Sequence, residues 1–559
     1  MNASSHLENS TSNINPEVLN HPAGLFILFF TEMWERFSYY GMRALLVLFL
    51  VTALDGGGWG WSRENAALLY GIYTGLVYLT PVIGGWIADR FTGFKTAVVL
   101  GAFLMTLGHA SLAVETVFSF YLGLVLLIVG NGMFKPNISS MVGGLYKDET
   151  KKDGAYTIFY MGINAGAFLG IMLCGYVGEM VGWSYGFGLA GVFMFFGLLQ
   201  FYFAQKVFSE IGSKPKRRTF DILDIQNDLR NERPYEVIPG FNEKQVESEI
   251  ESKLVDASQK EKLSVLEELR NRMRNKVETD RLLVVAIFAF FVIVFWWAFE
   301  QAGSSMTIFA KDYTERVLTG SSATIYIWSN FFLTVVPILV VTWVLALLFK
   351  QTFKAIPLSN LFLGTSFVLI WGIVIWKVYS EFSSANEIEV PASWFGILNS
   401  FFIITLAPLF SKIWETKLNP SGPVKFALGL VFAGVGFAFL AYGAMGIEAG
   451  ASTASVSMFW LIAAYLFHTV GEICLSPVGL SYVSKLTPKR LLGLMFGVWF
   501  LANFFANLIG GWTASTIDAM NESIGLSGFF LVFTAIPIGA GLIMLLLTPF
   551  LKKRMHGIH

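Results

Sequence analysis

The sequence predicts an all-α polytopic membrane protein, and three observations support this fold class. Of its 559 residues, 55% are hydrophobic and only 14% are charged, whereas soluble domains carry about 25% charged residues. Apolar runs recur along the chain, and each is long enough to cross a hydrocarbon core of about 30 Å. Lys and Arg gather in the connections on one side. This composition excludes a secreted, cytosolic or nucleic-acid-binding protein. The net charge of zero also provides no general basic field for a polyanion.

The apolar runs predict about 14 spans, at residues 24–53, 66–88, 96–114, 118–145, 154–178, 183–205, 282–310, 322–349, 356–380, 393–414, 424–446, 456–484, 490–514 and 526–551. One long polar stretch separates the sixth run from the seventh. We therefore expect an N-terminal cytoplasmic tail, a six-helix bundle, a cytoplasmic linker with a partly amphipathic helix, a C-terminal bundle and a second cytoplasmic tail, at residues 1–21, 22–205, 206–281, 282–551 and 552–559.

Positive charge in the connections predicts the orientation of the spans. With both termini in the cytoplasm, the outward loops hold only Arg63, Lys311, Arg316 and Lys377, and the inward loops hold many more bases. The N-terminal tail lacks the basic segment of a signal peptide. These features predict a multi-pass plasma-membrane protein, placed in the inner membrane of a bacterium.

Two groups of six helices joined by a long cytoplasmic linker are the organisation of the major facilitator superfamily. The connection between spans two and three reads Gly85-Trp-Ile-Ala-Asp89-Arg90-Phe-Thr-Gly93-Phe-Lys95. It resembles the short loop signature of that superfamily, with one extra residue before the second glycine. Gly93 would permit the tight turn. The signature carries no information about the substrate.

Seven ionisable residues lie inside predicted spans: Glu32, Glu35, Arg36, Arg43, Lys135, Glu300 and Glu472. Each would cost at least ~2.5 kcal/mol if it faced lipid, so these residues must face one another or water. At about 100° per residue, Glu32, Arg36 and Arg43 share one face of the first helix, with Glu35 at its edge. A structural salt-bridge network between helices is the alternative interpretation of this polar stripe.

The seven residues include four acids and three bases, so full ionisation would leave one buried carboxylate without a partner. A desolvated carboxylate beside another is readily protonated, which a proton-moving transporter requires. The tyrosines Tyr39, Tyr40 and Tyr73 could instead supply hydrogen bonds to a lone carboxylate.

At this point the sequence resembles a known family, the proton-dependent oligopeptide transporters. Five motifs carry the resemblance in the family order: Glu32-Met-Trp-Glu35-Arg36-Phe-Ser-Tyr39-Tyr40-Gly41-Met-Arg43, Gly130-Asn-Gly-Met-Phe-Lys135-Pro136-Asn137, Phe159-Tyr160-Met-Gly162-Ile-Asn164-Ala-Gly166-Ala-Phe168, Trp296-Trp-Ala-Phe-Glu300-Gln301 and Gly471-Glu472-Ile-Cys-Leu-Ser476-Pro477-Val-Gly479. Trp499 falls where the family has a pocket tryptophan. The resemblance covers about residues 22–550, apart from the linker and one insertion.

Two departures from the family pattern affect the prediction. The family's Leu-Asn-Pro stretch reads Leu398-Asn399-Ser400 here, which puts the bending of that helix in doubt. The two extra helices of many prokaryotic members do not lie in the linker, because residues 318–386 hold two spans between the seventh and eighth family helices. We expect them to form a peripheral hairpin on the C-terminal bundle.

The resemblance implies proton-coupled symport of di- and tripeptides into the cell by alternating access, in a protein that functions as a monomer in the lipid bilayer. Proton coupling would involve Glu32, Glu35, Arg36 and Glu300, and the pairs Arg43–Glu300 and Lys135–Glu472 would act as gates. No metal or organic cofactor is expected; the proton is the coupling ion.

A peptide is a zwitterion, so its site needs an anion-binding end and a cation-binding end. Arg36 and Lys135 could hold the carboxylate. The ammonium end, with the first carbonyl, and the aromatic walls of the pocket would involve Glu472, Asn164, Asn399, Ser476, Tyr39, Tyr73, Trp296 and Trp499.

Two other functions remain open on the sequence. The first is proton-coupled symport of another small anionic or peptide-like solute, such as a drug or a nitrate-like anion. The second, a membrane enzyme, would need a nucleophile–base pair or a metal site. The histidines inside spans, His109 and His468, have no partner at ligand spacing, so we predict that the protein is not an enzyme. His468 is one turn from Glu472 and is expected to be a hydrogen-bonded packing residue.

Overall fold

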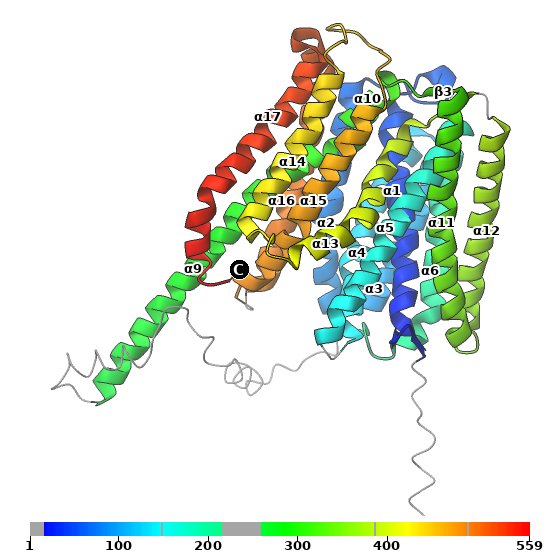
Figure 1. Ribbon diagram of the computed structural model, residues 1–559. Coiled ribbons are helices and arrows are strands. Elements are labelled where there is room, and N and C mark those ends of the chain that lie inside the picture. The colour runs from blue at the N-terminus through cyan, green and yellow to red at the C-terminus, as the bar shows by residue number, and fades with distance from the viewer. Residues whose placement is uncertain (1–15, 147–148, 215–258, 385–386, 489–490, 559) are drawn as a thin grey trace, which may run out of the picture. The chain divides into compact units, whose positions relative to one another are not determined.

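The computed structural model describes residues 16–146, 149–214, 259–384, 387–488 and 491–558. Parts of the predicted tail 1–21 and linker 206–281 therefore lie outside the described residues. Thirteen helices are long and apolar enough to cross a membrane, and the predicted all-α polytopic fold is confirmed (Figure 1). The first predicted span, α1 (Ala23–Val51), is not one of the thirteen because of its charged residues, although nearly all of it is buried.

The described chain divides into two compact units. Unit 1 comprises residues up to Pro215, Ala302–Ile404 and Ser452–Met458. Its helices are α1, α2 (Arg63–Ile87), α3 (Phe94–Leu112), α4 (Val117–Gly144), α5 (Glu149–Met180), α6 (Trp183–Ala204), α10 (Ser305–Asp312), α11 (Gly320–Thr352) and α12 (Pro357–Ser383). Its shorter elements are strand pairs β1 (Glu17–Val18) with β2 (His21–Pro22) and β3 (Val317–Thr319) with β4 (Glu387–Glu389), and the turns η1 (Leu54–Gly56), η2 (Ala88–Thr92), η3 (Gln205–Phe208) and η5 (Ala392–Gly396).

Unit 2 comprises Lys216–Gln301, Thr405–Ala451 and Phe459–His559. Its described helices are α9 (Gln259–Phe299), α14 (Gly422–Gly443), α15 (Phe459–Leu486), α16 (Leu492–Ser515) and α17 (Ile517–Arg554). The helix α13 (Ile397–Trp414) begins in unit 1 and ends in unit 2. A core of apolar side chains joins α9, α14, α15, α16 and α17. The described part of the predicted amphipathic segment is the start of α9, which continues into the membrane span without a break.

The seventh predicted span, 282–310, is interrupted in the structure. The helix α9 ends at Phe299, a 3-10 turn η4 covers Glu300–Gly303, and α10 begins at Ser305. Glu300, which the sequence predicts to lie in the seventh helix, therefore lies in this interruption. Gln301 is held there because its Nε2 donates to the carbonyl oxygen of Gly510 on α16 at 3.0 Å.

The superfamily-like loop takes the conformation that its glycine predicts. One π-helical turn, η2, contains the exposed Asp89 and Arg90, and Gly93 follows with a φ of 75°. A Cβ atom at Gly93 would lie 2.6 Å from the carbonyl oxygen of Ser213. Both the backbone angle and the close approach exclude a larger residue.

The inserted hairpin α11–α12 lies against the first bundle rather than the second. The two helices pack on each other and α12 packs on α6, as Figure 1 also shows, and the whole insertion belongs to unit 1. Ser359 at the start of α12 donates its hydroxyl to the carbonyl oxygen of Gln200 on α6 at 2.8 Å. The hairpin was predicted to lie on the C-terminal bundle because it follows the seventh helix in the chain, but the structure places it in unit 1.

A buried polar network holds the hairpin. Nζ of Lys377 lies 2.7 Å from Oε1 of Glu381, and that oxygen also accepts from Nδ2 of Asn330 on α11 at 2.7 Å. Trp394, at the start of the next span, donates to Oδ1 of Asn330 at 3.1 Å. The Lys377 ammonium also faces the ring of Tyr176 on α5 at 5.1 Å. Lys377 is thus not a loop residue, as the charge count assumed, but a paired and buried residue of α12.

Candidate functional site

The first helix is held against α5 by a row of glycines. A Cβ atom at Gly166 would lie 2.1 Å from the carbonyl oxygen of Met33, and one at Gly170 would lie 2.2 Å from that of Phe37. Gly162, one turn earlier, meets Phe29. Small residues at this four-residue spacing let two membrane helices approach closely. The fifth-helix motif therefore packs directly behind the charged stripe of α1.

Glycines also bring α4 close to its neighbours. A Cβ atom at Gly84 on α2 would lie 1.9 Å from the carbonyl oxygen of Gly132. One at Gly130 would lie 2.9 Å from the carbonyl oxygen of Gly101 on α3. Between these two contacts, Asn131 projects from α4 and reaches the first helix. The motif that contains Lys135 is thus fixed against both α2 and α3.

The centre of the site is an arginine held by two carboxylates. Nη2 of Arg36 donates to Oε1 of Glu35 at 2.7 Å, and its Nε also contacts Glu35. The same Nε lies 3.2 Å from Oε1 of Glu32. Nδ2 of Asn131 donates to Oε1 of Glu35 at 3.0 Å. All four side chains are almost completely buried.

The described cluster carries two acids and one base, and its hydrogen bonding is incomplete. Oε2 of Glu32 and Oδ1 of Asn131 are buried and have no hydrogen-bond partner among the described residues. A buried carboxylate oxygen without a donor is costly. Protonation of either acid would remove the excess negative charge, and a ligand or water could supply the missing donors.

Tyrosines surround the bases of α1. The guanidinium of Arg36 lies over the ring of Tyr39, 5.2 Å from its centroid, and that of Arg43 lies over Tyr70 at 5.4 Å. Nε of Arg43 also donates to the hydroxyl of Tyr70. Tyr73 is buried, and its hydroxyl has no hydrogen-bond partner among the described residues. Aromatic rings therefore lie beside both bases of α1.

Lys135 and the two predicted asparagines are more accessible than the central cluster. Nζ of Lys135 lies 5.1 Å from the centroid of the Tyr78 ring, and the side chain is half-buried. Nδ2 of Asn164 donates to the carbonyl oxygen of Tyr160 on its own helix. Asn399 is half-buried on α13. The amide oxygen of Asn164 can therefore still accept a hydrogen bond.

The predicted residues of unit 2 lie on α9, its following turn, α15 and α16. Glu300 is buried in η4, directly after the helix that carries Trp296. Glu472 and Ser476 lie one turn apart on α15, and both are half-buried. Oγ of Ser476 is buried without a hydrogen-bond partner among the described residues. This short polar stripe matches the sequence prediction in position, and its role stays a prediction.

The predicted aromatic residues of unit 2 are packed. Trp499 is 5% exposed and lies on Gly479, where a Cβ atom would be 2.5 Å from the indole ring. Trp296 is half-buried and packs against the apolar core. The ring of His468 lies 4.4 Å from that of Phe437, and the residue is buried. This is the environment of a packing histidine, but both ring nitrogens are buried and have no hydrogen-bond partner of good geometry among the described residues.

The two predicted gates each join residues of different units. Arg43 and Lys135 belong to unit 1, whereas Glu300 and Glu472 belong to unit 2. Each unit is described by itself, so the pairs Arg43–Glu300 and Lys135–Glu472 stay predictions.

Three residues that complete the site in unit 1 were not predicted from the sequence. Asn131 binds Glu35, Tyr70 binds Arg43, and Tyr78 faces Lys135. One signal was available, because Asn131 precedes Lys135 by one helical turn and so shares its face. Nothing in the sequence indicated that Tyr70 and Tyr78, in addition to Tyr73 on the same helix, would contact the charged residues.

Comparison with known proteins identifies relatives of this chain. The sequence profile of the POT family matches residues 95–358 and 372–530. The chain is 32% identical to the uncharacterized transporter YclF of Bacillus subtilis over 550 residues, which covers 96% of each protein. It is also 32% identical to the peptide transporter YePEPT of Yersinia enterocolitica (95% of this chain, 94% of the relative). A di-/tripeptide transporter of Lactococcus lactis is 31% identical (96% of this chain, 97% of the relative).

Solved structures of peptide transporters resemble this chain in fold. A crystal structure of the peptide transporter POT in complex with sulfate aligns with a TM-score of 0.69 at 29% identity, covering 97% of this chain and 98% of that one. A mutant of the peptide transporter POT in complex with alafosfalin aligns with a TM-score of 0.70 at 28% identity, with the same coverage.

Proposed function

The chain belongs to the POT family, the proton-dependent oligopeptide transporters, and from this premise we propose that it carries di- and tripeptides into the cell together with protons. Its relatives include a peptide transporter and a di-/tripeptide transporter, which supports the substrate class. We propose alternating access as the mechanism, with the bacterial inner membrane as the location, both termini in the cytoplasm and the monomer as the functional form.

The observation that carries the proposal is the buried cluster of α1 and α4. Arg36 is bound by both Glu32 and Glu35, and Asn131 binds Glu35 in turn. Arg36 is the residue predicted to bind the peptide carboxylate, yet its Nε and Nη2 are already engaged by these acids. A carboxylate ligand therefore competes with at least one of the two acids for the guanidinium.

This competition provides a physical route to coupling. When a proton neutralises Glu32 or Glu35, that acid loses its charge-assisted hydrogen bond to Arg36. The guanidinium is then free to bind the carboxylate of a peptide in place of the neutralised acid. Proton and peptide binding would thus favour each other, as symport requires. The coupling ion in this scheme is the proton, and no metal or organic cofactor takes part.

The remaining roles follow the sequence prediction and are part of the proposal. Lys135 assists Arg36 at the carboxylate end. Glu472 and the amide groups of Asn164 and Asn399 bind the ammonium end, with Ser476 beside them. Side-chain pockets would be formed by Tyr39, Tyr73, Trp296 and Trp499. Glu300 contributes to proton coupling and pairs with Arg43 in one gate, and Lys135 pairs with Glu472 in the other.

Transport in proteoliposomes tests the proposal. The wild-type protein should accumulate a labelled dipeptide when a proton gradient, acidic on the substrate side, is imposed. Glu32→Gln and Glu35→Gln should each abolish this accumulation and retain counterflow of the dipeptide, because a neutral amide cannot release and rebind the proton.

Glu210→Gln, at an exposed acid of the described chain, is the matched control and should transport normally. If gradient-driven uptake and counterflow fall equally in both Glu32→Gln and Glu35→Gln, the acids do not couple the proton. A wild-type protein that accumulates a non-peptide anion but no dipeptide would favour the other solute class.

A further inference from the structure

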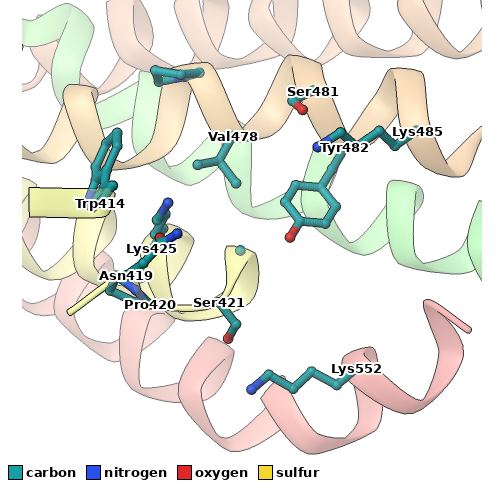
Figure 2. Close-up of a pocket in the computed structure, with 12 residues that line it drawn as sticks. Trp414, Asn419, Pro420, Ser421, Lys425, Val478, Ser481, Tyr482, Lys485 and Lys552 are labelled. Atoms are coloured by element: carbon teal, nitrogen blue, oxygen red, sulfur yellow. The ribbon is translucent and has the colours of Figure 1, made fainter. Parts of the chain in front are cut away.

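A cavity of about 740 Å³ lies in unit 2, where four helices end on the side that the sequence predicts to be cytoplasmic. It is lined by the end of α13, the start of α14, the last turns of α15 and the end of α17: Trp414, Asn419, Pro420, Ser421, Gly422, Lys425, Pro477, Val478, Ser481, Tyr482, Lys485 and Lys552 (Figure 2). Apart from Pro477, which borders Ser476, its lining is separate from the residues proposed to bind peptide.

The lining is basic. It includes Lys425, Lys485 and Lys552, and no acid is present among the described lining residues. None of these three lysines forms a salt bridge with a described residue. Three ammonium groups around one cavity repel one another, so an anion in the cavity would stabilise this arrangement.

One of the lysines is oriented by an aromatic ring. Nζ of Lys425 lies 4.2 Å from the centroid of the Trp414 ring, in a cation–π contact. This contact leaves the ammonium protons directed away from the ring available for hydrogen bonds. Figure 2 shows Trp414 and Lys425 on one side of the cavity and Lys552 near Ser421.

The start of α14 adds hydrogen-bond donors from the backbone and from Ser421. Ser421 is the N-cap residue of this 22-residue helix, but its hydroxyl makes no capping hydrogen bond. Its Oγ atom is buried and has no hydrogen-bond partner among the described residues. Pro423 has no N–H, and the N–H of Gly422 bonds the hydroxyl of Tyr482, so Val424 supplies the N–H of the first turn that has no intrahelical acceptor. This N–H and the positive end of the helix dipole favour an anion here. Gly422 lets Tyr482 approach, because a Cβ atom there would lie 2.3 Å from the ring.

Exposed apolar side chains lie near the ends of two of these helices. On α17, Leu546 is 81% exposed and Phe550 is 41% exposed, and both precede Lys552 by less than two turns. On α13, Leu409 is 53% exposed. A molecule bound in the cavity by its anionic group could therefore lay acyl chains on these side chains.

We propose that this cavity is a binding site for a phosphate group, and that its occupant is the phosphodiester headgroup of an anionic phospholipid. Lys425, Lys485 and Lys552 neutralise the phosphate. Ser421 Oγ and the N–H of Val424 donate hydrogen bonds to its oxygens, and the exposed apolar side chains of α13 and α17 receive the chains. Basic pockets between helices at the cytoplasmic membrane surface bind such headgroups.

Lipid titration of the full-length protein in detergent tests the site. Native mass spectrometry would count bound phosphatidylglycerol, with phosphatidylcholine as the zwitterionic lipid and inorganic phosphate as the free anion. Each lysine near a headgroup is worth about fivefold in affinity, so Lys425→Gln/Lys485→Gln should weaken phosphatidylglycerol binding roughly 30-fold. Ser421→Ala, a milder change that keeps the charge, should weaken it about threefold.

Lys553→Gln is the matched control, since Lys553 is exposed on the same helix as Lys552 but does not line the cavity. It should bind phosphatidylglycerol within twofold of the wild type. Inorganic phosphate that binds with the same dependence on Lys425, Lys485 and Ser421 would support the phosphate site and identify the free anion as an alternative source. Equal binding of both lipids, or equal affinity in the double variant and the Lys553→Gln control, would overturn the proposal.

Discussion

The close crossing of α1 and α5 can be tested by adding one carbon atom. In Gly166→Ala, the new Cβ would lie 2.1 Å from the carbonyl oxygen of Met33 and 2.9 Å from Cβ of Arg36. An ordinary contact of this kind begins near 3.4 Å. The two helices must therefore separate locally by about 1.3 Å, the difference between 3.4 and 2.1 Å. The obstacle is backbone, so no rotamer change relieves it.

Overpacking of this kind costs about 1–3 kcal/mol, and here the displaced backbone carries Arg36. We expect Gly166→Ala to unfold at a lower temperature in detergent. Peptide uptake in proteoliposomes should fall further than stability alone explains, because the Arg36 cluster moves relative to Asn131, whose hydrogen bond to Glu35 is only 3.0 Å long.

The control is Gly372→Ala. Gly372 lies on α12, and a Cβ atom there would meet nothing within 4 Å. Since Ala forms helix better than Gly by about 1 kcal/mol, this variant should be as stable as the wild type or more stable. If Gly166→Ala matches Gly372→Ala in melting temperature and uptake, the helices do not cross as closely as described and the reasoning fails.

Two further predictions concern buried polar contacts. Lys377→Met leaves Glu381 buried without its counter-ion and should lower the free energy of unfolding by about 3–5 kcal/mol; adding Glu381→Leu should recover part of this loss in a thermal melt, and simple additivity would argue against the pair. Asn131→Leu leaves Oε1 of Glu35 with Arg36 alone and should cost about 1–3 kcal/mol; normal coupled uptake in this variant would show that Asn131 has no part in the site.

The family was recognisable from the sequence because its motifs are local. Glu32, Glu35 and Arg36 lie within two helical turns, so their shared face follows from helix periodicity alone. The profile match and the peptide transporters among the relatives confirm the resemblance. The spans were equally predictable, because the hydrophobic thickness of a bilayer imposes a minimum length on each apolar run.

The contacts that complete the site were not predictable, since they join helices far apart in the chain. Asn131 meets Glu35 across 96 residues, and only the tertiary structure shows that Gly166 faces Met33. The sequence also misplaced Lys377, because a charged residue near the end of an apolar run resembles a loop residue. Its partner Glu381 is local, but Asn330, which completes the network, lies 51 residues from Glu381.

The membrane fold, the family and the charged residues of α1 can therefore be predicted from the sequence, because each depends on composition or on spacing within one helix. The break between α9 and α10, the attachment of the hairpin to α6, and the convergence of Lys425, Lys485 and Lys552 on one cavity are visible only in the folded protein. The physical reason is that these features arise where separate helices pack. Hydropathy determines that a helix crosses the membrane, whereas side-chain volume and polar pairing between helices determine which neighbour it meets.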